Sequence, residues 1–260
     1  MHARPVVLAA ISLALIGGSS PAPRTTRYKV QTTSEQVVNL SAVGQGEQRT
    51  SFGLVNYFTI TLDDTVGGRT VHAVLDSVIK ADTSALTTQA VLDSARGRAW
   101  HALLTPENKI SNVKQLDSAE AGGQASMLLN NFFPRVKRGA KVGDQWVDTT
   151  EFTNEQSGQT ITTKTVTNYS VTGQEAHEGQ QALKVEAAFS MAQTGVLNQG
   201  GGTMSIDGTG KGTATYWVTA DGTYLGSNST AMSDLQVTAD QLPEPIPVHA
   251  NNSVVVSIIK

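Results

Sequence analysis

The residues that could do acid–base or metal chemistry are scattered along the chain. The five histidines are His2, His72, His101, His177 and His249. No two of them have the i, i+4 spacing that places two zinc ligands on one helix face. The chain also lacks the Gly-x-Ser-x-Gly motif that presents a nucleophilic serine on a tight turn. We therefore predict no catalytic residue and no enzyme activity, although a hydrolase site assembled from distant residues stays open.

A glycine-rich stretch, residues 208–213, invites a phosphate-binding interpretation because it contains Lys211. A P-loop needs Ser or Thr directly after the lysine and a helix behind the loop. Here Gly212 follows and no helical pattern comes next, so we predict a flexible loop that leads into a strand. Aspartates such as Asp63 and Asp221 lie in turns without the ligand spacing of a calcium loop. We predict no metal site and no cofactor.

The composition narrows the classes of function further. The 260 residues include 19 Lys+Arg and 22 Asp+Glu, a formal net charge of −3, whereas nucleic-acid binders usually carry a basic face. We therefore expect no nucleic-acid partner. The absence of cysteine excludes disulfides, thiolate metal sites, cysteine nucleophiles and a lipid-modified N-terminal cysteine.

The N-terminal residues have the pattern of an export signal. Arg4 is followed by an apolar run from Val6 to Ile16 and then by small residues and Pro21. The run is too short to span a bilayer, which takes about 20 residues. We predict a signal peptide over residues 1–24 and a mature protein in the periplasm or outside the cell.

The body of the chain alternates between apolar and polar residues, as half-buried strands do. The alternation runs through residues 54–62, 71–79 and 182–191, and turn residues such as Asp221-Gly222 separate such runs. Within residues 71–79 it places four apolar residues on one face: Val71, Ala73, Leu75 and Ile79. One apolar and one threonine-rich face predict an antiparallel sheet that is wetted on one side.

Two segments have helical spacing instead. Residues 84–96 carry Thr83 or Ser84 as an N-cap and Gly97 just past the end. Residues 118–133 follow a cap at Asp117 or Ser118 and stop at Pro134.

These elements predict an α+β fold: a predominantly antiparallel β-sheet curled into a half-barrel, with two short helices on its concave side. A faint repeat relates Val55-Asn56-Tyr57 to Thr167-Asn168-Tyr169 and suggests two β-rich halves that meet near residues 118–143. We expect a β-rich domain over residues 25–240, then a proline-rich linker and a C-terminal strand over residues 241–260.

Several turn-and-strand motifs resemble an uncharacterised family of exported bacterial proteins over most of residues 27–238. They are the stretch from Gly97-Arg98-Ala99-Trp100 to Val113, Phe133-Pro134 with Lys141-Val142-Gly143-Asp144-Gln145-Trp146, the stretch from Asn168-Tyr169 to Gly173, and residues 208–215 leading into Asp221-Gly222. Many members of that family look like lipoproteins, and this chain departs from them in having no cysteine. The topology is also similar to the half-barrels of periplasmic lipoprotein carriers, a resemblance that implies acyl chains held under helices.

A membrane β-barrel would also show alternating strands. Aromatic residues make up only 5% of this chain, however, too few for the two girdles of such a barrel. Threonine-rich faces would also meet lipid badly. We expect that the protein is not an integral membrane protein.

The large apolar residues that remain are candidates for ligand contact: Leu128, Leu129, Phe132, Phe133 and Trp217. The first four lie in the second predicted helix, which would cover a concave, mostly apolar cavity. The preferred hypothesis is an exported, non-enzymatic binding protein for an acyl chain, a lipid or another apolar small molecule. The alternative is a structural or interaction module that pairs with an envelope protein through an exposed edge strand near residues 252–259.

Overall fold

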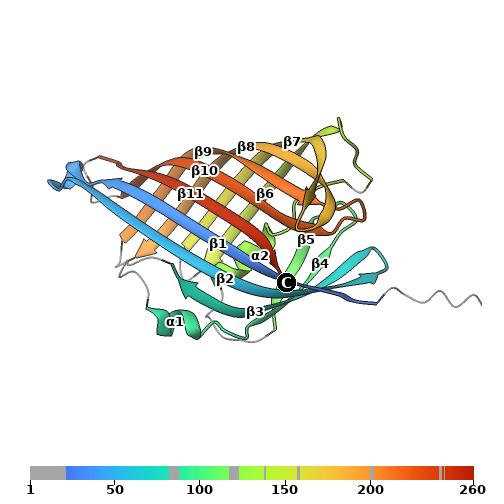
Figure 1. Cartoon of the computed structure of the whole chain (residues 1–260). Coiled ribbons are helices and arrows are strands. Elements are labelled where there is room, and N and C mark those ends of the chain that lie inside the picture. The colour runs from blue at the N-terminus through green and yellow to red at the C-terminus, as the bar shows by residue number, and fades with distance from the viewer. Residues whose placement is uncertain are drawn as a thin grey trace, which may run out of the picture.

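Figure 1 shows the computed structural model of the chain, which describes residues 22–81, 88–116, 123–137, 139–156, 159–199, 202–239, 242 and 244–260. The strands are β1 (Arg24–Asn39), β2 (Glu47–Thr65), β3 (Gly68–Lys80), β4 (Ala99–Leu104), β5 (Ile110–Gln115), β6 (Gln145–Gln156), β7 (Gln159–His177), β8 (Gln180–Gln199), β9 (Gly202–Val218), β10 (Tyr224–Ala239) and β11 (Ile246–Ile259). The α-helices are α1 (Gln89–Asp93) and α2 (Gly123–Asn130), and a 3₁₀ turn covers Ser41–Val43. The predicted signal peptide lies outside the described residues except for residues 22–24, the last of which begins β1.

The strands form one antiparallel sheet in the order β5-β4-β3-β2-β1-β11-β10-β9-β8-β7-β6. The sheet is not closed, because β5 and β6 each have a single neighbour among the described strands. Figure 1 shows it curling around α2, which lies within the curve. The predicted fold class, a predominantly antiparallel half-barrel with two short helices, is confirmed. The two predicted halves of the chain lie side by side in one continuous sheet, joined where β1 pairs with β11.

The C-terminal strand is central rather than peripheral. β11 pairs with β1 on one side and with β10 on the other, over most of its length. The expectation of an exposed edge near residues 252–259 is therefore wrong, because both backbone edges of this segment have partners. The edges of the described sheet are β5 and β6.

Alternation along the strands separates an inner face, which carries the buried residues, from an outer face. In β8, Leu183, Val185 and Ala187 are buried, as the pattern over residues 182–191 predicts. The prediction for residues 71–79 fails at its end, because Ile79 is 47% exposed and Val78 is buried. The register between β2 and β3 shifts at a bulge that skips one residue of β3, and this reverses the faces beyond it.

Both helices are shorter than predicted. α1 begins after Thr88, whose hydroxyl accepts a hydrogen bond from the Val91 amide. The predicted caps at Thr83 and Ser84 lie outside the described residues. α2 ends at Asn130, and Phe132 and Phe133 lie in the turn that follows it. Both phenylalanines are buried against the inner face of the sheet, as is Leu129 of α2.

The glycine-rich stretch is part of a strand rather than a flexible loop. Residues 208–213 lie in the middle of β9, and Gly208, Gly210 and Gly212 all face inward. A Cβ at Gly212 would lie 2.4 Å from the Phe189 ring, which lies across this position from β8. The alternate glycines therefore make room for large side chains of neighbouring strands.

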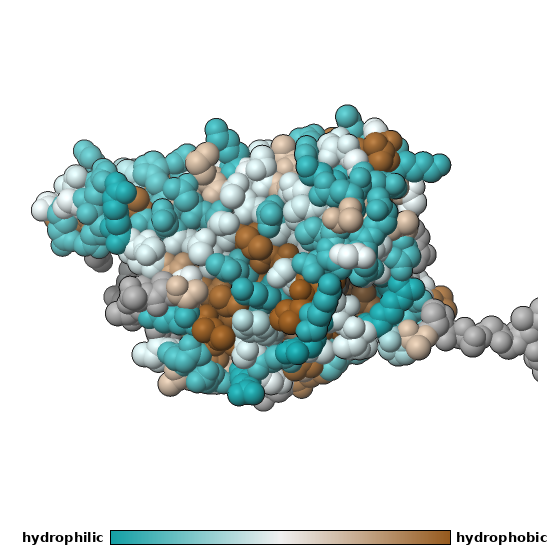
Figure 2. Space-filling model, in the orientation of Figure 1, coloured by the Kyte–Doolittle hydropathy of each residue, from teal (hydrophilic) through white to brown (hydrophobic). Residues whose placement is uncertain are grey.

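The outer face is mostly polar where Figure 2 shows it, with hydrophobic residues between the polar ones. Ile79 and Val255 are among the exposed hydrophobic residues of the chain. Within the described part of the chain, neither helix has the length and apolar character needed to cross a membrane.

Candidate functional site

A cavity of about 440 Å³ lies on the inner face beneath α2; we call it the α2 cavity. Strands β1, β2 and β8 to β11 and the end of α2 line it. Its hydrophobic and aromatic lining residues are Val30, Phe52, Leu54, Leu128, Phe132, Phe189, Tyr216, Tyr224, Val254 and Val256. Its polar lining residues are Thr32, Asn56, Asn131, Ser227 and Ser229. The volume lies within the range of small-molecule sites, about 300–1,000 Å³.

Phe132 anchors one wall of the α2 cavity. Its ring centroid lies 5.0 Å from that of Tyr28, 5.1 Å from that of Phe133 and 5.5 Å from that of Tyr224, all in edge-on geometry. Such edge-to-face contacts are favourable beyond the area that they bury. The chain leaving α2 is thereby fixed to β1 and β10, and the wall is held in place.

The tyrosines around the cavity remain neutral. Burial raises the pKa of Tyr216, and it raises that of Tyr224 well above its ordinary value. The Tyr224 hydroxyl donates to Ser227 Oγ at 2.6 Å, and the Tyr28 hydroxyl donates to the Tyr224 carbonyl at 2.8 Å. The Tyr28 hydrogen bond ties β1 to β10 across β11, and the Tyr224 hydrogen bond lies within β10 and fixes the position of its ring.

Two polar side chains that line the α2 cavity have an atom without a hydrogen bond. Asn56 is only 4% exposed, and its Nδ2 has no partner; the same is true of Thr32 Oγ1. A buried donor without a partner costs free energy, so native structures contain few of them. Both residues face inward, from adjacent strands β1 and β2.

The structure brings together some of the predicted binding residues and separates others. Leu128 and Phe132 line the α2 cavity. Leu129 and Phe133 are buried in the core behind it and are not among its lining residues. Trp217 faces outward, where its ring stacks on His177 with centroids 4.1 Å apart and its Nε1 donates to Glu175.

Sequence reasoning missed most of the strand residues that line the cavity. Val30 and Leu54 lie at inward positions of alternating segments, so alternation places them on an inner face, whereas Val254 belongs to a run of three valines in which alternation gives no face. Local patterns did not indicate that β1 and β11 are neighbours. Without that pairing, Thr32 and Asn56 could not be assigned to the same cavity as Val254.

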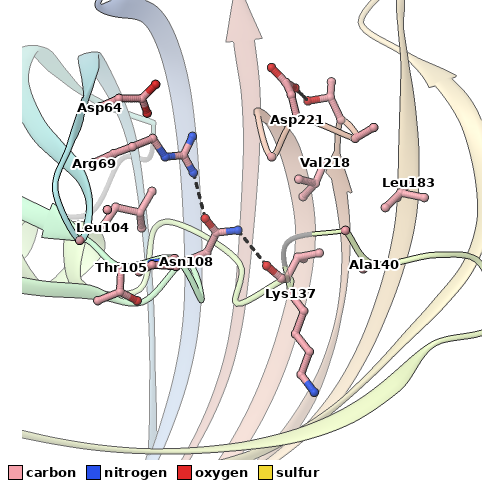
Figure 3. Close-up of a pocket in the computed structure, with 18 of the residues that line it drawn as sticks. Asp64, Arg69, Leu104, Thr105, Asn108, Lys137, Ala140, Leu183, Val218 and Asp221 are labelled. Carbon is pink, nitrogen blue, oxygen red and sulfur yellow. Dashed lines mark hydrogen bonds between the residues drawn. The ribbon is translucent and has the colours of Figure 1, made fainter. Parts of the chain in front are cut away.

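A second cavity, of about 380 Å³, lies at the end of the sheet where the β2–β3, β4–β5 and β9–β10 turns meet; we call it the turn-end cavity (Figure 3). Its polar centre is Asn108, which accepts a hydrogen bond from Arg69 at 2.9 Å and donates one to the Val136 carbonyl at 2.9 Å. Lys137 points away from this pair (Figure 3).

Acidic and hydroxyl groups at the rim of the turn-end cavity are also paired. Asp221 accepts hydrogen bonds from Thr219 and Thr223 and forms an ion pair with Arg24. The hydrogen bond from Thr219, followed by those from Arg24 and Thr223, lowers the pKa of Asp221 to about 2. The polar groups of this cavity therefore largely satisfy one another.

The charged and metal-ligating side chains of the described residues do not gather at the α2 cavity. No cluster of three or more His, Cys, Asp or Glu side chains that could hold a metal ion occurs among them. None of the described residues that line the α2 cavity is charged. What this arrangement can do chemically is enclose an apolar molecule and offer it a few uncharged hydrogen-bonding groups.

Comparison with known proteins gives no family for the chain. No protein-family model matches it, and no curated protein sequence matches it. Among solved structures, a mutant porin of Rh. blastica is 9% identical, with 91% of this chain and 100% of that chain covered and a TM-score of 0.28. OmpT of Vibrio cholerae is 6% identical, with 92% and 99% covered and a TM-score of 0.21. Similarities this low carry no argument about fold or function.

Proposed function

We propose that this chain is an exported, non-enzymatic binding protein that holds an acyl chain or another apolar molecule in the α2 cavity. The observation that carries the proposal is the α2 cavity itself. A long strip of apolar side chains borders a space of about 440 Å³ beneath a short helix. Binding sites for small molecules are concave, mostly apolar spaces of this size with a few polar groups, and the α2 cavity fits that description.

The lining supports an apolar ligand in particular. Val30, Leu54, Leu128, Phe132 and Val254 would contact a hydrocarbon chain from both the sheet and the α2 side. Each methylene that leaves water contributes about 0.8 kcal/mol to binding. Export rests on the apolar run and the small residues of the first 24 positions, and it places the proposed site in the periplasm or outside the cell.

Native mass spectrometry of the full chain, purified without detergent, tests the proposal. We expect an excess mass that disappears after organic extraction. Ser229→Trp should abolish it, because Ser229 lines the α2 cavity and an indole there would fill the space. The matched control is Thr230→Trp, one position along β10 and exposed on the outer face, which should retain the excess mass. If the native mass of the wild-type protein equals that of the chain alone across several growth conditions, the proposal is refuted.

A second candidate function is pairing with an envelope protein through β6. This edge strand pairs only with β7 among the described strands, and its Val147 is 63% exposed. An unpaired edge can accept a strand from a partner. A stable protein partner that co-purifies with both Ser229→Trp and wild type, without any extractable mass, would favour this candidate.

A further inference from the structure

The polar residues of the α2 cavity indicate which kind of head group its ligand carries. Asn56 Nδ2 can only donate a hydrogen bond, and Thr32 Oγ1 can donate one. Neither atom has a hydrogen-bond partner, although Asn56 is only 4% exposed. Buried donors of this kind are normally satisfied by protein, by water or by a bound molecule. A ligand that satisfied both would have to present a hydrogen-bond acceptor.

The two donors come from neighbouring inward positions of adjacent strands. Asn56 is directly opposite Val30 in the β1–β2 pair, and Thr32 is the next inward residue of β1. Asn56 and Thr32 are therefore diagonal neighbours on one face, a relation in which Cα atoms lie about 7–8 Å apart. A carbonyl oxygen has two lone pairs and can accept from both side chains. An alkane has none.

The charge of the lining decides between the acyl compounds that carry such a carbonyl. Among its described lining residues the α2 cavity has no Lys, Arg or His that could pair with a carboxylate. Moving an ionised carboxylate into an apolar site without a counter-charge is strongly unfavourable. Tyr216 and Tyr224 remain neutral, because burial raises the pKa of each. The lining therefore matches an uncharged acyl group better than a free fatty acid.

We propose that the α2 cavity selects an uncharged acyl ester or amide, whose carbonyl oxygen accepts hydrogen bonds from Asn56 Nδ2 and Thr32 Oγ1. The inference rests on the proposed function and deepens it, because it names the class of ligand. The hydrocarbon chain lies along Val30, Leu54 and Val254, and the ester or amide lies at the polar row of β1 and β2.

Competition binding to the full chain at pH 8 tests the ester or amide assignment. Three compounds that carry a C16 chain compete with a fluorescent apolar probe, N-phenyl-1-naphthylamine. Methyl palmitate carries a neutral carbonyl, palmitate carries a charge and hexadecane carries no acceptor. We expect methyl palmitate to displace the probe with at least about tenfold higher affinity than hexadecane, since each of the two net hydrogen bonds is worth a factor of about five. Palmitate should be weaker than the ester by at least the same factor.

The variants Asn56→Leu and Thr32→Val remove each donor while keeping the size of the side chain similar. Each should reduce the preference for ester over hexadecane several-fold. Asn228→Leu, on the exposed outer face of β10, is the control and should keep the wild-type preference. Because the wild-type ligand series and Thr32→Val each test the inference alone, a fold defect in Asn56→Leu does not remove the test.

The outcomes separate the inference from the function beneath it. Equal displacement by all three compounds, or strongest displacement by palmitate, would overturn the ester or amide assignment and leave apolar binding intact. A preference for ester that survives in both donor variants would overturn the roles of Asn56 and Thr32. A wild-type protein that binds neither the probe nor any of the three compounds would overturn the proposed function together with the inference.

Discussion

The α2 cavity and the turn-end cavity are built from the same sheet, but their buried polar groups differ in how they are satisfied. In the turn-end cavity, Asn108 both accepts from Arg69 and donates to the Val136 carbonyl, so its amide is used at both ends. In the α2 cavity, Asn56 leaves its Nδ2 without a partner. Polar groups that satisfy one another stabilise a fold, whereas a buried donor left over beside an apolar space is suited to a ligand.

The contrast assigns different roles to the two cavities. The turn-end cavity is lined by three turns, and Asn108 and Asp221 at its centre and rim are hydrogen-bonded to neighbouring residues. The α2 cavity is formed by strand residues and by Phe132, and its lining is mainly hydrophobic and aromatic. We therefore expect changes at the turn end to alter stability, and changes in the α2 cavity to alter binding.

Removing the Phe132 ring should have the largest effect on stability. Phe132→Ala should lower the free energy of unfolding by about 3–5 kcal/mol, because the aromatic rings packed around it, among them Tyr28 and Tyr224, cannot fully close the hole. Urea denaturation followed by circular dichroism measures this. Val147→Ala, at an exposed position of β6, is the control and should change stability by less than about 0.5 kcal/mol. A loss below about 1 kcal/mol for Phe132→Ala would mean that Phe132 is not an anchor of the α2 wall.

Breaking the hydrogen bonds of Asn108 should lower the stability of the fold without changing ligand affinity, which distinguishes the role of the turn-end cavity from that of the α2 cavity. Asn108→Ala should cost about 2 kcal/mol of stability, because the Val136 carbonyl loses its donor and alanine is strained at the φ of 58° found here. The affinity for methyl palmitate should not change. Urea denaturation measures the free energy of unfolding, and the probe competition measures the affinity for methyl palmitate. Weaker ligand binding without loss of stability would reverse the roles assigned to the two cavities.

Replacing Trp217 should have a small effect on both stability and probe binding, although its side chain is large. It lies on the outer face against His177 and outside the α2 cavity. Trp217→Ala should therefore lower the free energy of unfolding by only about 1 kcal/mol and leave probe binding within twofold of wild type. Loss of binding in this variant would show that the ligand contacts the outer face instead.

The smallest effect should be an acid-dependent one at the rim of the turn-end cavity. The pKa of Asp221 is about 2 in the folded protein, below its ordinary value of 3.8. The stabilisation that this shift gives is complete above about pH 4 and is lost as the pH falls toward 2. The side chain is 53% exposed, so the contribution is below about 1 kcal/mol.

Asp221→Asn should remove this dependence. Its stability, measured by urea denaturation at several pH values, should fall less steeply than that of wild type between pH 4 and pH 2. Parallel curves for the two proteins would contradict the assignment of the acid dependence to Asp221. Ligand binding at neutral pH should be the same in both.

The sequence predicted the fold better than it predicted the site, for reasons that particular residues illustrate. Alternation is a local property, so the inward positions of Leu183, Val185 and Ala187 could be predicted from residues 182–191 alone. Ile79 was placed on the wrong face because a single bulge reverses the alternation, and no local residue type marks that bulge.

The site depends on pairings between distant segments. Phe132 and Leu128 could be predicted as cavity residues because an apolar helical segment must cover something. The C-terminal strand was expected at an edge, whereas it lies between β1 and β10 and supplies Val254 and Val256 to the cavity. The donors Asn56 and Thr32 gained significance only once the structure showed which of their atoms lack partners.

The most direct test of the account is to find where a bound acyl chain lies. NMR of the full chain with methyl-labelled Val and Leu can detect contacts between ligand protons and side-chain methyl groups in a complex with methyl palmitate. We predict contacts from the chain to Leu54, Leu128 and Val254 in the α2 cavity, and none to Leu183 or Val218 in the turn-end cavity. Contacts to Leu183 and Val218 instead, or to neither set, would contradict the assignment of the binding site to the α2 cavity.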